Sequence, residues 1–537
     1  MIRTRAISTL ALTTALAWAL PAHAQSAADF ATMKAQMEAM QVQLDAMKSK
    51  VDSLEGQLSQ AQVEAQTATA AAQSATASAT KASEVATKAA DAAPKVAWKG
   101  APEFTGKDGW SFKPRGRLHI DAGAISSPGQ FESPTLGGAA RVRRVRLGFE
   151  GTVPGGVGYK LETEFANASV GFGDVWITYA PANVPVLLRV GNFETLNSME
   201  QISSSNFNTF IERSSFNDAF INARRLGAAL AWRSTDNVWR VEAGLFAAHS
   251  IDSSLDNNGL IGAARLVYAP TALGGQLHFG LNYQYRDFAD NAGGGTSAGV
   301  ATPSTNQLAR YRARPNSQLT DVRFVDTGSF AAHSDQIVGA EAAAIFKGLY
   351  LSGEAQWLRS NAYAAGDRAT GLDVFSGGNT AVVPVNNPGF FGAYGEVGYF
   401  LTGETRGYRQ GDGTWARTKI LDPVTKGGAG AFQLAARYEY LDLDDDALLA
   451  GPVNNFTTGI AGPAALSSRL ARGGTQSSYL LALNWYPMDY VRFMIDYGHI
   501  QVEGGPIAAL AKPLSTMPVN RRNYGVDVFQ TRLQIDF

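Results

Sequence analysis

Hydrophobic and polar residues alternate one by one at the end of the chain. Phe529, Leu533, Ile535 and Phe537 share one parity, and polar or charged residues occupy the other from position 530 to 536. Side chains of a β-strand alternate between its two faces, so the segment predicts a strand with one apolar and one polar face. Such a strand, closed by an aromatic residue, is typical of a transmembrane β-barrel, with lipid outside and water inside.

The alternation recurs from Ser111 onward, where sixteen segments can be counted. We therefore predict an all-β transmembrane barrel of 16 antiparallel strands over residues 111–537. The expected strands, within a few residues, are Arg115–Ile125, Arg141–Val153, Val157–Asn167, Phe172–Pro181, Pro185–Phe193, Arg224–Arg233, Val238–His249, Ile261–Ala269, Gln276–Asp287, His333–Phe346, Leu349–Asn361, Phe391–Thr402, Gly430–Leu441, Ser478–Pro487, Tyr490–Ile500 and Arg522–Phe537.

The connections between these segments alternate in length. Short stretches such as Pro154-Gly155-Gly156 and Lys347-Gly348 alternate with long loops such as 194–223 and 288–332. Outer-membrane barrels have short turns in the periplasm and longer loops outside the cell. Residues 403–429 break this rule, because they would form a long connection on the periplasmic side, and the pattern gives no reason for it.

A different period marks the region before the barrel. Apolar residues from Phe30 to Ala89 follow alternating steps of three and four residues. The side chains at these positions become smaller along the chain, from Met and Leu to Ala. Such a heptad seam predicts an α-helical coiled coil. We assign residues 25–93 to a periplasmic coiled-coil arm and 94–110 to a linker, and we expect Pro94 to end the helix.

The seam of this arm cannot be buried by one helix. We therefore expect a homo-oligomer, and a homotrimer is the natural choice for a porin. The arm is also a candidate for contact with periplasmic structures. For Thr67–Ala92, a partly disordered Ala/Thr/Ser linker is the alternative interpretation.

The amino terminus has the features of a secretory signal. Arg3 and Arg5 precede the apolar run Ile7–Leu20, and small residues follow up to Ala24, after which we expect cleavage. No later run reaches the roughly 18 apolar residues of a membrane-spanning helix, so the mature chain is either soluble or a barrel. We expect the outer membrane of a Gram-negative bacterium.

The amino-acid composition fits an outer-membrane barrel. The chain has 56 Gly, 18 Tyr, 27 Phe and no Cys, and its formal net charge is −1. Electrostatic preference must then come from the local arrangement of charges, and we expect no nucleic-acid partner. Aromatic residues near strand ends are expected to face the membrane interfaces. They are Tyr179, Trp232, Trp239, Tyr399, Trp485, Tyr486 and Tyr490.

Strand parity also sorts the charged residues. With Leu118 and Ile120 facing lipid, the alternate residues of the first strand face the lumen, and Val145 and Leu147 orient the second strand likewise. The inward residues of these two strands are Arg115, Arg117, His119, Asp121, Arg144, Arg146 and Glu150, with Arg141 and Arg143 near the loop-side end. Carboxylates such as Glu162, Glu354 and Glu396 face inward too, so the lumen is mixed in charge.

A second basic run lies in the long loop after the ninth strand. In extended backbone, Arg310, Arg312 and Arg314 would share one face at a spacing of about 7 Å. Guanidinium groups bind phosphate or carboxylate oxygens in pairs, so the run could pass an anion from one group to the next. A solvated loop face is the alternative.

These residues give the chain a resemblance to the phosphate-selective porin O and P family. The similar stretches, in order, are Ser111–Leu118, the Arg143-Arg144 pair before a Leu-x-Phe-x-Gly strand, Asn282–Asp287, Arg312–Pro315, Leu401–Glu404 and Asn484-Trp485-Tyr486. The resemblance implies a sixteen-stranded homotrimer in which an arginine ladder leads to a constriction formed by the third loop.

By position in this resemblance, Arg117, Arg143 and Arg144 match constriction arginines, and Arg312 and Arg314 match ladder residues. The third loop is 194–223, and its Glu212-Arg213 pair is similar to that of the family. Asn206 stands where the phosphate-specific members carry a lysine. The loss of one cation weakens an anion site, so the resemblance leaves strict phosphate specificity open.

The expected function is a water-filled channel for passive diffusion of small anions, such as phosphate or polyphosphate, through the outer membrane. Its anion-binding constriction would contain Arg117, Arg143, Arg144 and Arg213, with a ladder of Arg310, Arg312 and Arg314. The alternative is a general or weakly selective porin whose arm tethers the envelope. With six His and no HExxH or GxSxG motif, we expect no enzyme, no cofactor and no metal site.

Overall fold

A computed structural model describes most of the chain. The described residues are 27–128, 136–166, 170–220, 223–248, 251, 259–288, 296–297, 300–301, 308–362, 380–382, 384–449, 453–455, 459–461, 473–508 and 517–537. The expected signal peptide, residues 1–24, lies outside these ranges. The chain divides into two compact units, residues 1–93 and 94–537, which are described separately.

The first unit contains one long helix, α1, Ala27–Ala92, of 66 residues. The predicted helix is therefore confirmed, whereas its assembly into a coiled coil stays a prediction. The helix continues through the Ala/Thr/Ser stretch, where hydroxyl groups such as those of Thr69 and Thr76 donate to the carbonyl four residues earlier. Alanine has the highest helix propensity, which supports helix here in place of the alternative linker. Within the described ranges, no helix is long and apolar enough to cross a bilayer.

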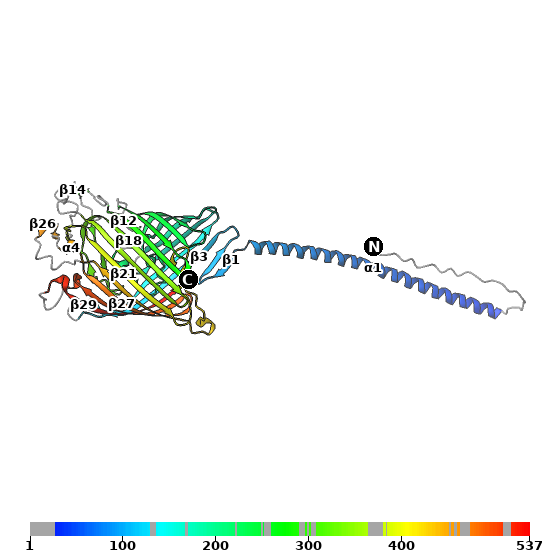
Figure 1. Ribbon diagram of the computed structural model, residues 1–537. Coiled ribbons are helices and arrows are strands. Elements are labelled where there is room, and N and C mark those ends of the chain that lie inside the picture. Colours follow the sequence, from blue (N-terminus) through cyan, green and yellow to red (C-terminus); the bar gives the residue numbers. More distant parts are fainter. Residues whose placement is uncertain are drawn as a thin grey trace. The chain divides into compact units, whose positions relative to one another are not determined.

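The second unit is a closed antiparallel barrel, and its described residues form the sixteen predicted strands. The last strand pairs with the first along Val528–Asp536 and Arg117–Ile125. The strands run tilted across the wall, as β12 and its neighbour β18 do in Figure 1. The barrel strands are β3 (Ser111–Ile125), β4 (Gly138–Val153), β5 (Val157–Glu164), β6 (Gly171–Tyr179), β7 (Val186–Glu194), β8 (Arg224–Arg233), β9 (Trp239–Ala247), β10 (Leu260–Tyr268), β12 (Gly275–Asp287), β18 (Phe330–Phe346), β19 (Leu349–Ala362), β21 (Gly389–Phe400), β24 (Ala431–Asp442), β27 (Thr475–Met488), β28 (Val491–Glu503) and β29 (Asn523–Asp536).

Shorter elements occupy the connections. A hairpin of β1 (Lys95–Trp98) and β2 (Pro102–Thr105) precedes the barrel and pairs with β3. The other short elements are α2 (Met199–Ile202), α3 (Ser215–Ala219), β11 (Thr271–Ala272), β13 (Thr296–Ser297), β14 (Val300–Ala301), β15 (Leu308–Ala309), β16 (Arg312–Ala313), β17 (Val325–Asp326), β20 (Thr380–Val382), β22 (Tyr408–Arg409), β23 (Thr414–Trp415), η4 (Val424–Lys426), α4 (Asp446–Leu449), β25 (Val453–Asn455), β26 (Gly459–Ala461), α5 (Gly505–Ala508) and η5 (Val519–Arg521).

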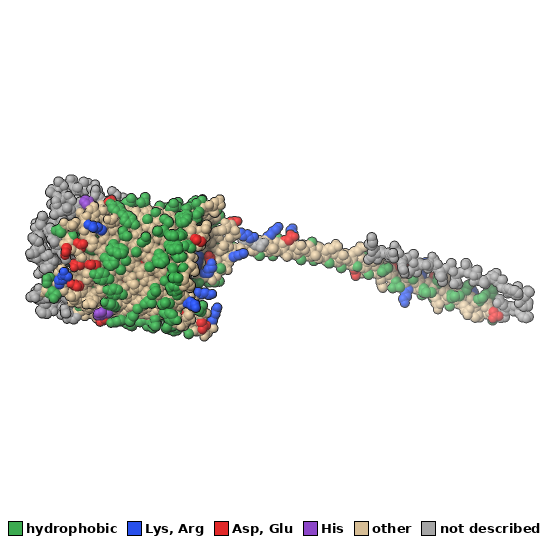
Figure 2. All heavy atoms as spheres, viewed as in Figure 1, with side chains coloured by type: hydrophobic (Ala, Val, Ile, Leu, Met, Phe, Trp, Pro, Cys, Tyr) green, Lys and Arg blue, Asp and Glu red, His purple; other side chains and the backbone are tan. Residues whose placement is uncertain are grey.

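The two faces of the barrel wall follow the predicted parity. In β29, Phe529, Leu533 and Ile535 are exposed on the outside, whereas Arg532 is 1 % exposed on the inside. Hydrophobic side chains cover the outer wall on the face shown in Figure 2, and charged side chains gather toward its two ends. This is the surface that a lipid bilayer requires of a spanning barrel.

The prediction that Tyr486 faces the membrane interface is wrong. Tyr486 is buried inside the barrel, where its hydroxyl donates to Gln433 Oε1 at 2.8 Å and accepts from Arg492. Its neighbour Trp485 is the one that faces outward. Adjacent residues of a strand point to opposite faces, so both could not join the same belt.

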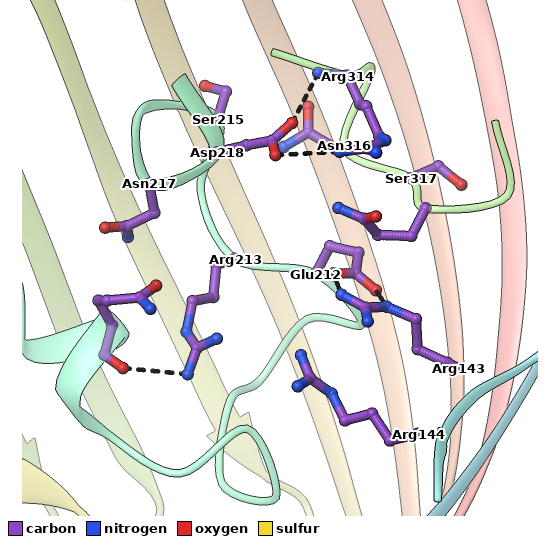
Figure 3. A pocket seen from close by; sticks show the side chains of 12 residues that line it. Arg143, Arg144, Glu212, Arg213, Ser215, Asn217, Asp218, Arg314, Asn316 and Ser317 are labelled. Atoms are coloured by element: carbon purple, nitrogen blue, oxygen red, sulfur yellow. Dashed lines mark hydrogen bonds and ion pairs between the residues drawn. The ribbon is translucent and has the colours of Figure 1, made fainter. Parts of the chain in front are cut away.

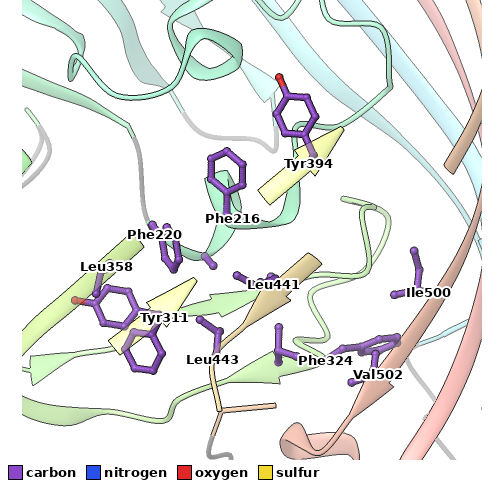
Figure 4. Close-up of a cluster of buried hydrophobic side chains, with 14 of the residues drawn as sticks. Phe216, Phe220, Tyr311, Phe324, Leu358, Tyr394, Leu441, Leu443, Ile500 and Val502 are labelled. Carbon is purple, nitrogen blue, oxygen red and sulfur yellow. The ribbon is translucent and has the colours of Figure 1, made fainter. Parts of the chain in front are cut away.

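An apolar core fills part of the barrel interior at the end where the long loops lie. Phe216 and Phe220 of the third loop and Tyr311 and Phe324 of the segment 308–330 pack together in this core. Wall residues of β19, β21, β24 and β28 complete it (Figure 4). Apolar side chains therefore fill part of the interior at this end of the barrel.

Candidate functional site

The third loop, residues 195–223, crosses the interior of the barrel and is fixed to the opposite wall. Ile211 N donates to Asp496 Oδ2 of β28 at 2.7 Å, and Arg532 Nη1 of β29 donates to Ile211 O at 2.6 Å. Asn484 Nδ2 of β27 donates to Thr209 O at 2.9 Å. Backbone groups that no secondary structure satisfies thus find partners on three wall strands, which holds the loop across the lumen.

Carboxylates on another part of the wall hold the two short helices of the loop. Glu200 N at the start of α2 donates to Glu354 Oε1 of β19 at 2.8 Å, and Ser215 N of α3 donates to Glu439 Oε2 of β24 at 2.9 Å. Arg437 of β24 then binds Glu200 Oε1 at 2.7 Å. The buried glutamates of the lumen are therefore anchors for the loop.

A second inward segment, residues 308–330, meets the third loop. Asn316 adopts a left-handed conformation, with φ of 51°. Its side chain donates to Glu439 at 2.6 Å and accepts from Ser478 at 2.7 Å, and its carbonyl accepts from Gln530 at 3.0 Å. Asparagine tolerates this backbone conformation better than most residues, and the three hydrogen bonds stabilise it.

A β-bulge turns two consecutive arginines toward these loops. His119 of β3 pairs with Arg144 of β4, but the next residue, Ile120, pairs with Val142, which leaves Arg143 as the extra residue. Strict alternation would send Arg143 and Arg144 to opposite faces. The bulge re-aims one of them, so both side chains point into the lumen.

Both side chains line a cavity of about 190 Å³ between β4, the third loop and the segment 308–330. Figure 3 shows Arg143, Arg144 and Arg213 directed toward one another from β4 and the third loop, with Arg314 on the opposite side. The other lining residues are neutral or acidic: Gln201, Glu212, Ser215, Asn217, Asp218, Asn316, Ser317 and Gln318. The volume is enough for several waters or one small hydrated ion.

Two of the four arginines form ion pairs at the cavity. Arg143 forms a bidentate ion pair with Glu212, at 2.9 and 3.2 Å. Arg314 pairs with Asp218 at 3.2 Å and with Asp321 at 2.9 Å. Burial would raise the pKa of Glu212, but the charges of Arg143 and Arg532 outweigh burial and hold it well below its ordinary value.

The other two arginines have no carboxylate partner in the part of the chain that the structure describes. Arg213 donates to the carbonyl oxygens of Glu200, Gln201 and Ser203 at 3.0 to 3.1 Å, and burial lowers its pKa. Arg144 is 8 % exposed, and its Nε atom has no hydrogen-bond partner. Four guanidinium groups against the carboxylates of Glu212 and Asp218 leave the cavity positive.

The structure does not bring all the expected site residues together. Arg117 lies outside the cavity lining and binds Glu162 and Ser205, both at 2.9 Å. Arg310 pairs with Asp326 at 2.6 Å, and Arg312 is exposed. The three arginines of the expected ladder alternate with the buried Tyr311 and Ala313, so they do share a face. Only Arg314 reaches the cavity.

Asn206 is buried at the tip of the third loop. Its Oδ1 lies 3.2 Å from His119 Nε2, and its carbonyl accepts from Gln534 at 3.1 Å. It does not line the cavity around Arg144.

The long connection 403–429 folds back into the barrel from the side of the short turns. Trp415 N donates to Ser203 Oγ of the third loop at 2.9 Å, and Arg406 donates to Phe207 O. Trp415 and Ile420 are buried in a second apolar cluster together with Met199. The length of this connection is explained by its path, because it must enter the lumen and return.

Sequence reasoning missed Asp218, Asn316 and the residues of this inward connection. The length of the connection and its Trp415 offered a signal, since a tryptophan is usually largely buried. Within the described ranges, no group of three or more acidic or histidine side chains is placed to hold a metal ion.

A closed barrel with an apolar outer belt, a polar interior and an inward-folded third loop defines an outer-membrane porin. The family model of the phosphate-selective porins O and P matches residues 112–537, so the chain belongs to that family. Porins of this family are channels of the Gram-negative outer membrane.

Two curated relatives cover most of the chain. An uncharacterized protein of Caulobacter vibrioides is 33 % identical over 451 residues, which are 82 % of this chain and 77 % of the relative. Porin O of Pseudomonas aeruginosa is 25 % identical over 403 residues, which are 72 % of this chain and 82 % of the relative.

Solved structures of other porins are similar at low sequence identity. The anion-selective porin from Comamonas acidovorans is 10 % identical, with a TM-score of 0.42 over 80 % of this chain and 100 % of its own. The outer membrane channel DcaP of Acinetobacter baumannii is 12 % identical, with a TM-score of 0.43 over 81 % of this chain and 99 % of its own.

Proposed function

We propose that this porin is a passive diffusion channel for small anions, such as phosphate or polyphosphate, and that the cavity around Arg144 is its anion-binding constriction. The buried Arg144 guanidinium carries the proposal. A buried charge without a counterion is costly, and a passing anion would supply one. Arg143 and Arg213 lie at the same cavity and add to its positive potential.

The neutral lining residues suit the same role. Asn217, Asn316, Ser215 and Ser317 present amide and hydroxyl groups to the cavity. Such groups can replace part of the water around an oxyanion. A channel requires binding of this kind, strong enough for the anion to enter and weak enough for it to leave. Residues 310–314 would deliver anions from the loop side, with Arg314 as the last member of the series. Arg117 would support the tip of the third loop through Ser205.

The test is the reversal potential in planar bilayers under a KCl gradient, for the natural protein and for Arg144→Gln. We expect anion preference in the natural protein and a severalfold lower anion-to-cation permeability ratio in the variant. Arg521→Gln is the control, because it removes the same charge from a site that is 69 % exposed on the loop side. An unchanged ratio in Arg144→Gln would refute the assignment.

Phosphate added to the same bilayers distinguishes a phosphate-binding channel from a general anion porin. A chloride current that falls at low phosphate concentration and recovers in Arg144→Gln supports a phosphate site. A current that phosphate leaves unchanged supports the alternative of a general or weakly selective anion porin on the same scaffold.

We also propose that α1 assembles with two other copies of the chain as a trimeric coiled coil. Its apolar seam is exposed along a single helix, with Met37 64 % and Leu58 61 % exposed. Burial of such a seam between helices is the usual driving force for association. Native mass spectrometry of the chain with residues 29–91 deleted should show a less stable trimer, while single-channel conductance stays the same. A trimer of unchanged stability would refute the role of the arm in trimer assembly, and tethering of the envelope would remain as its alternative role.

A further inference from the structure

A second cavity lies on the other side of the tip of the third loop, away from Arg144. It is enclosed by Asn206 and Phe207, by the inward connection 403–429 and by the wall of β27, β28 and β29. Its volume is about 20 Å³, close to the space of one water molecule. Three arginines, Arg406, Arg417 and Arg492, and two carboxylates, Asp489 and Asp536, line it.

Both carboxylates of this cavity are already engaged. Arg417 forms an ion pair with Asp536 and also donates to the carbonyl oxygen of Asp489. Asp489 Oδ1 accepts a hydrogen bond from Ile420 N at 2.9 Å. Asp536 is thus ion-paired with Arg417, whereas the Asp489 carboxylate accepts a hydrogen bond from the backbone of the inward connection.

Among the described residues, neither Arg406 nor Arg492 forms an ion pair, although Glu396 lies within electrostatic range of Arg406 and Asp496 within range of Arg492. Arg406 is 4 % exposed and lies over the rings of Tyr350 and Trp415, at 5.1 and 4.8 Å. Arg492 is 2 % exposed and donates to Asn208 O at 2.6 Å and to Gln534 Oε1 at 2.9 Å. The Nε atoms of both arginines are buried and have no hydrogen-bond partner.

We propose that Arg406 and Arg492 bind a small inorganic anion of halide size in this second cavity. A buried guanidinium group that forms no ion pair has lost hydration, and a bound anion would offset part of that cost. The unpartnered Nε–H groups supply donors for it. A cavity with room for one water fits a halide and excludes a hydrated oxyanion while the third loop and the inward connection remain joined.

This inference deepens the proposed function and rests on it. Of the small anions that pass Arg144, a halide would meet a second site beyond the tip of the third loop, whereas a hydrated oxyanion would not enter that site. The simpler alternative is that Arg406 and Arg492 only hold the carbonyl oxygens of Phe207 and Asn208 in place. A purely structural clasp would bind no anion.

Crystals of the full chain with bromide in place of chloride test the site directly. We expect anomalous scattering between Arg406 and Arg492, and loss of that signal in Arg492→Gln. Signal at Arg144 alone would overturn the inference and leave the proposed function standing. Signal in the second cavity alone would support the inference and refute the role of Arg144. No signal in either cavity would refute both.

Conductance as a function of KCl concentration gives a second readout. The natural protein should saturate, and Arg406→Gln and Arg492→Gln should raise the half-saturating concentration by roughly threefold or more. Arg409→Gln is the matched control, since Arg409 belongs to the same connection but is 65 % exposed. Arg492→Lys keeps the charge if the glutamine variant fails to fold, and it should remain close to the natural protein. An equal half-saturating concentration in all variants would overturn the inference.

Discussion

Arg143 of β4 and Glu212 of the third loop form a two-point ion pair, with Nε to Oε1 at 2.9 Å and Nη2 to Oε2 at 3.2 Å. Glu212 Oε1 also accepts from Arg532 of β29 at 2.9 Å. Strands β4 and β29 lie on either side of β3, so one carboxylate fixes the loop to both. The same carboxylate lowers the positive charge of the cavity around Arg144.

Glu212→Gln should raise anion preference. A unit charge roughly 6 Å from an ion contributes about 0.7 to 3 kcal/mol at effective dielectric constants of about 80 to 20, and salt reduces this. We expect a severalfold higher anion-to-cation permeability ratio from reversal potentials. Glu150→Gln is the control, because Glu150 pairs with Arg115 outside the cavity lining. A lower ratio in Glu212→Gln would contradict the charge balance described here.

Arg437→Met should loosen the third loop. Arg437 is buried and binds Glu200, Glu396 and Glu439, which the variant would leave without their shared cation. Loss of one partner of a buried ion pair costs about 3 to 5 kcal/mol of unfolding free energy. The thermal midpoint should fall and the open-channel current should become larger and noisier.

For the Arg437 variant, Arg409→Met is the comparison. Arg409 is also ion-paired, but its side chain is 65 % exposed and that of its partner Asp412 is 36 % exposed, so its removal should change the unfolding free energy by less than about 1 kcal/mol. Equal thermal midpoints for the two variants would show that Arg437 does not hold the loop.

Phe216→Ala should widen the passage. Phe216 is fully buried and stacks on Tyr394, with ring centroids 6.1 Å apart. Truncation of a buried phenylalanine costs about 3 to 5 kcal/mol of unfolding free energy through the cavity it leaves. Single-channel conductance should rise as α3 loses its packing. Phe279→Ala on the outer face should leave conductance unchanged, and a rise there would point to a general loss of barrel integrity.

Asp444, beyond the end of β24, should make stability depend on pH. Burial and the neighbouring charge of Asp442 raise the pKa of Asp444 to about 6. The folded state therefore favours the protonated form, and this contribution is present below pH 4 and is lost as pH rises through 6. The thermal midpoint should fall between about pH 4 and pH 7, and Asp444→Asn should flatten that part of the profile. If Asp444→Asn has the same dependence of the thermal midpoint on pH as the natural protein, Asp444 is not the group responsible.

Most of the fold could be predicted from the sequence because it depends on local periodicity. Strand β29 was expected at Arg522–Phe537 and spans Asn523–Asp536, and β19 was expected at Leu349–Asn361 and spans Leu349–Ala362. Alternation fixes which face a residue takes, so Arg117, Arg532 and Glu396 were correctly placed inside. Tyr486 was misplaced only because its position near a strand end was given more weight than its parity.

The candidate site was less predictable, because contacts between distant segments create it. The bulge beside His119 decides that Arg143 joins Arg144 in the lumen, and its location follows from pairing between β3 and β4. Arg314 reaches the cavity because Asn316 is fixed to β24, β27 and β29. Neither fact has a signature in the local sequence.

By itself, the sequence determined the barrel, its strand number and the face of nearly every charged side chain. Side chains of a strand alternate between two faces, and the apolar face must contact lipid, so the charged residues of the other parity face the lumen. Tertiary structure decided which charges remain uncompensated. Glu212 forms an ion pair with Arg143, and Asp218 forms one with Arg314, whereas the buried Arg144 forms none among the described residues. Ion pairing depends on distances of a few ångströms between segments far apart in the chain, and only the folded barrel sets those distances.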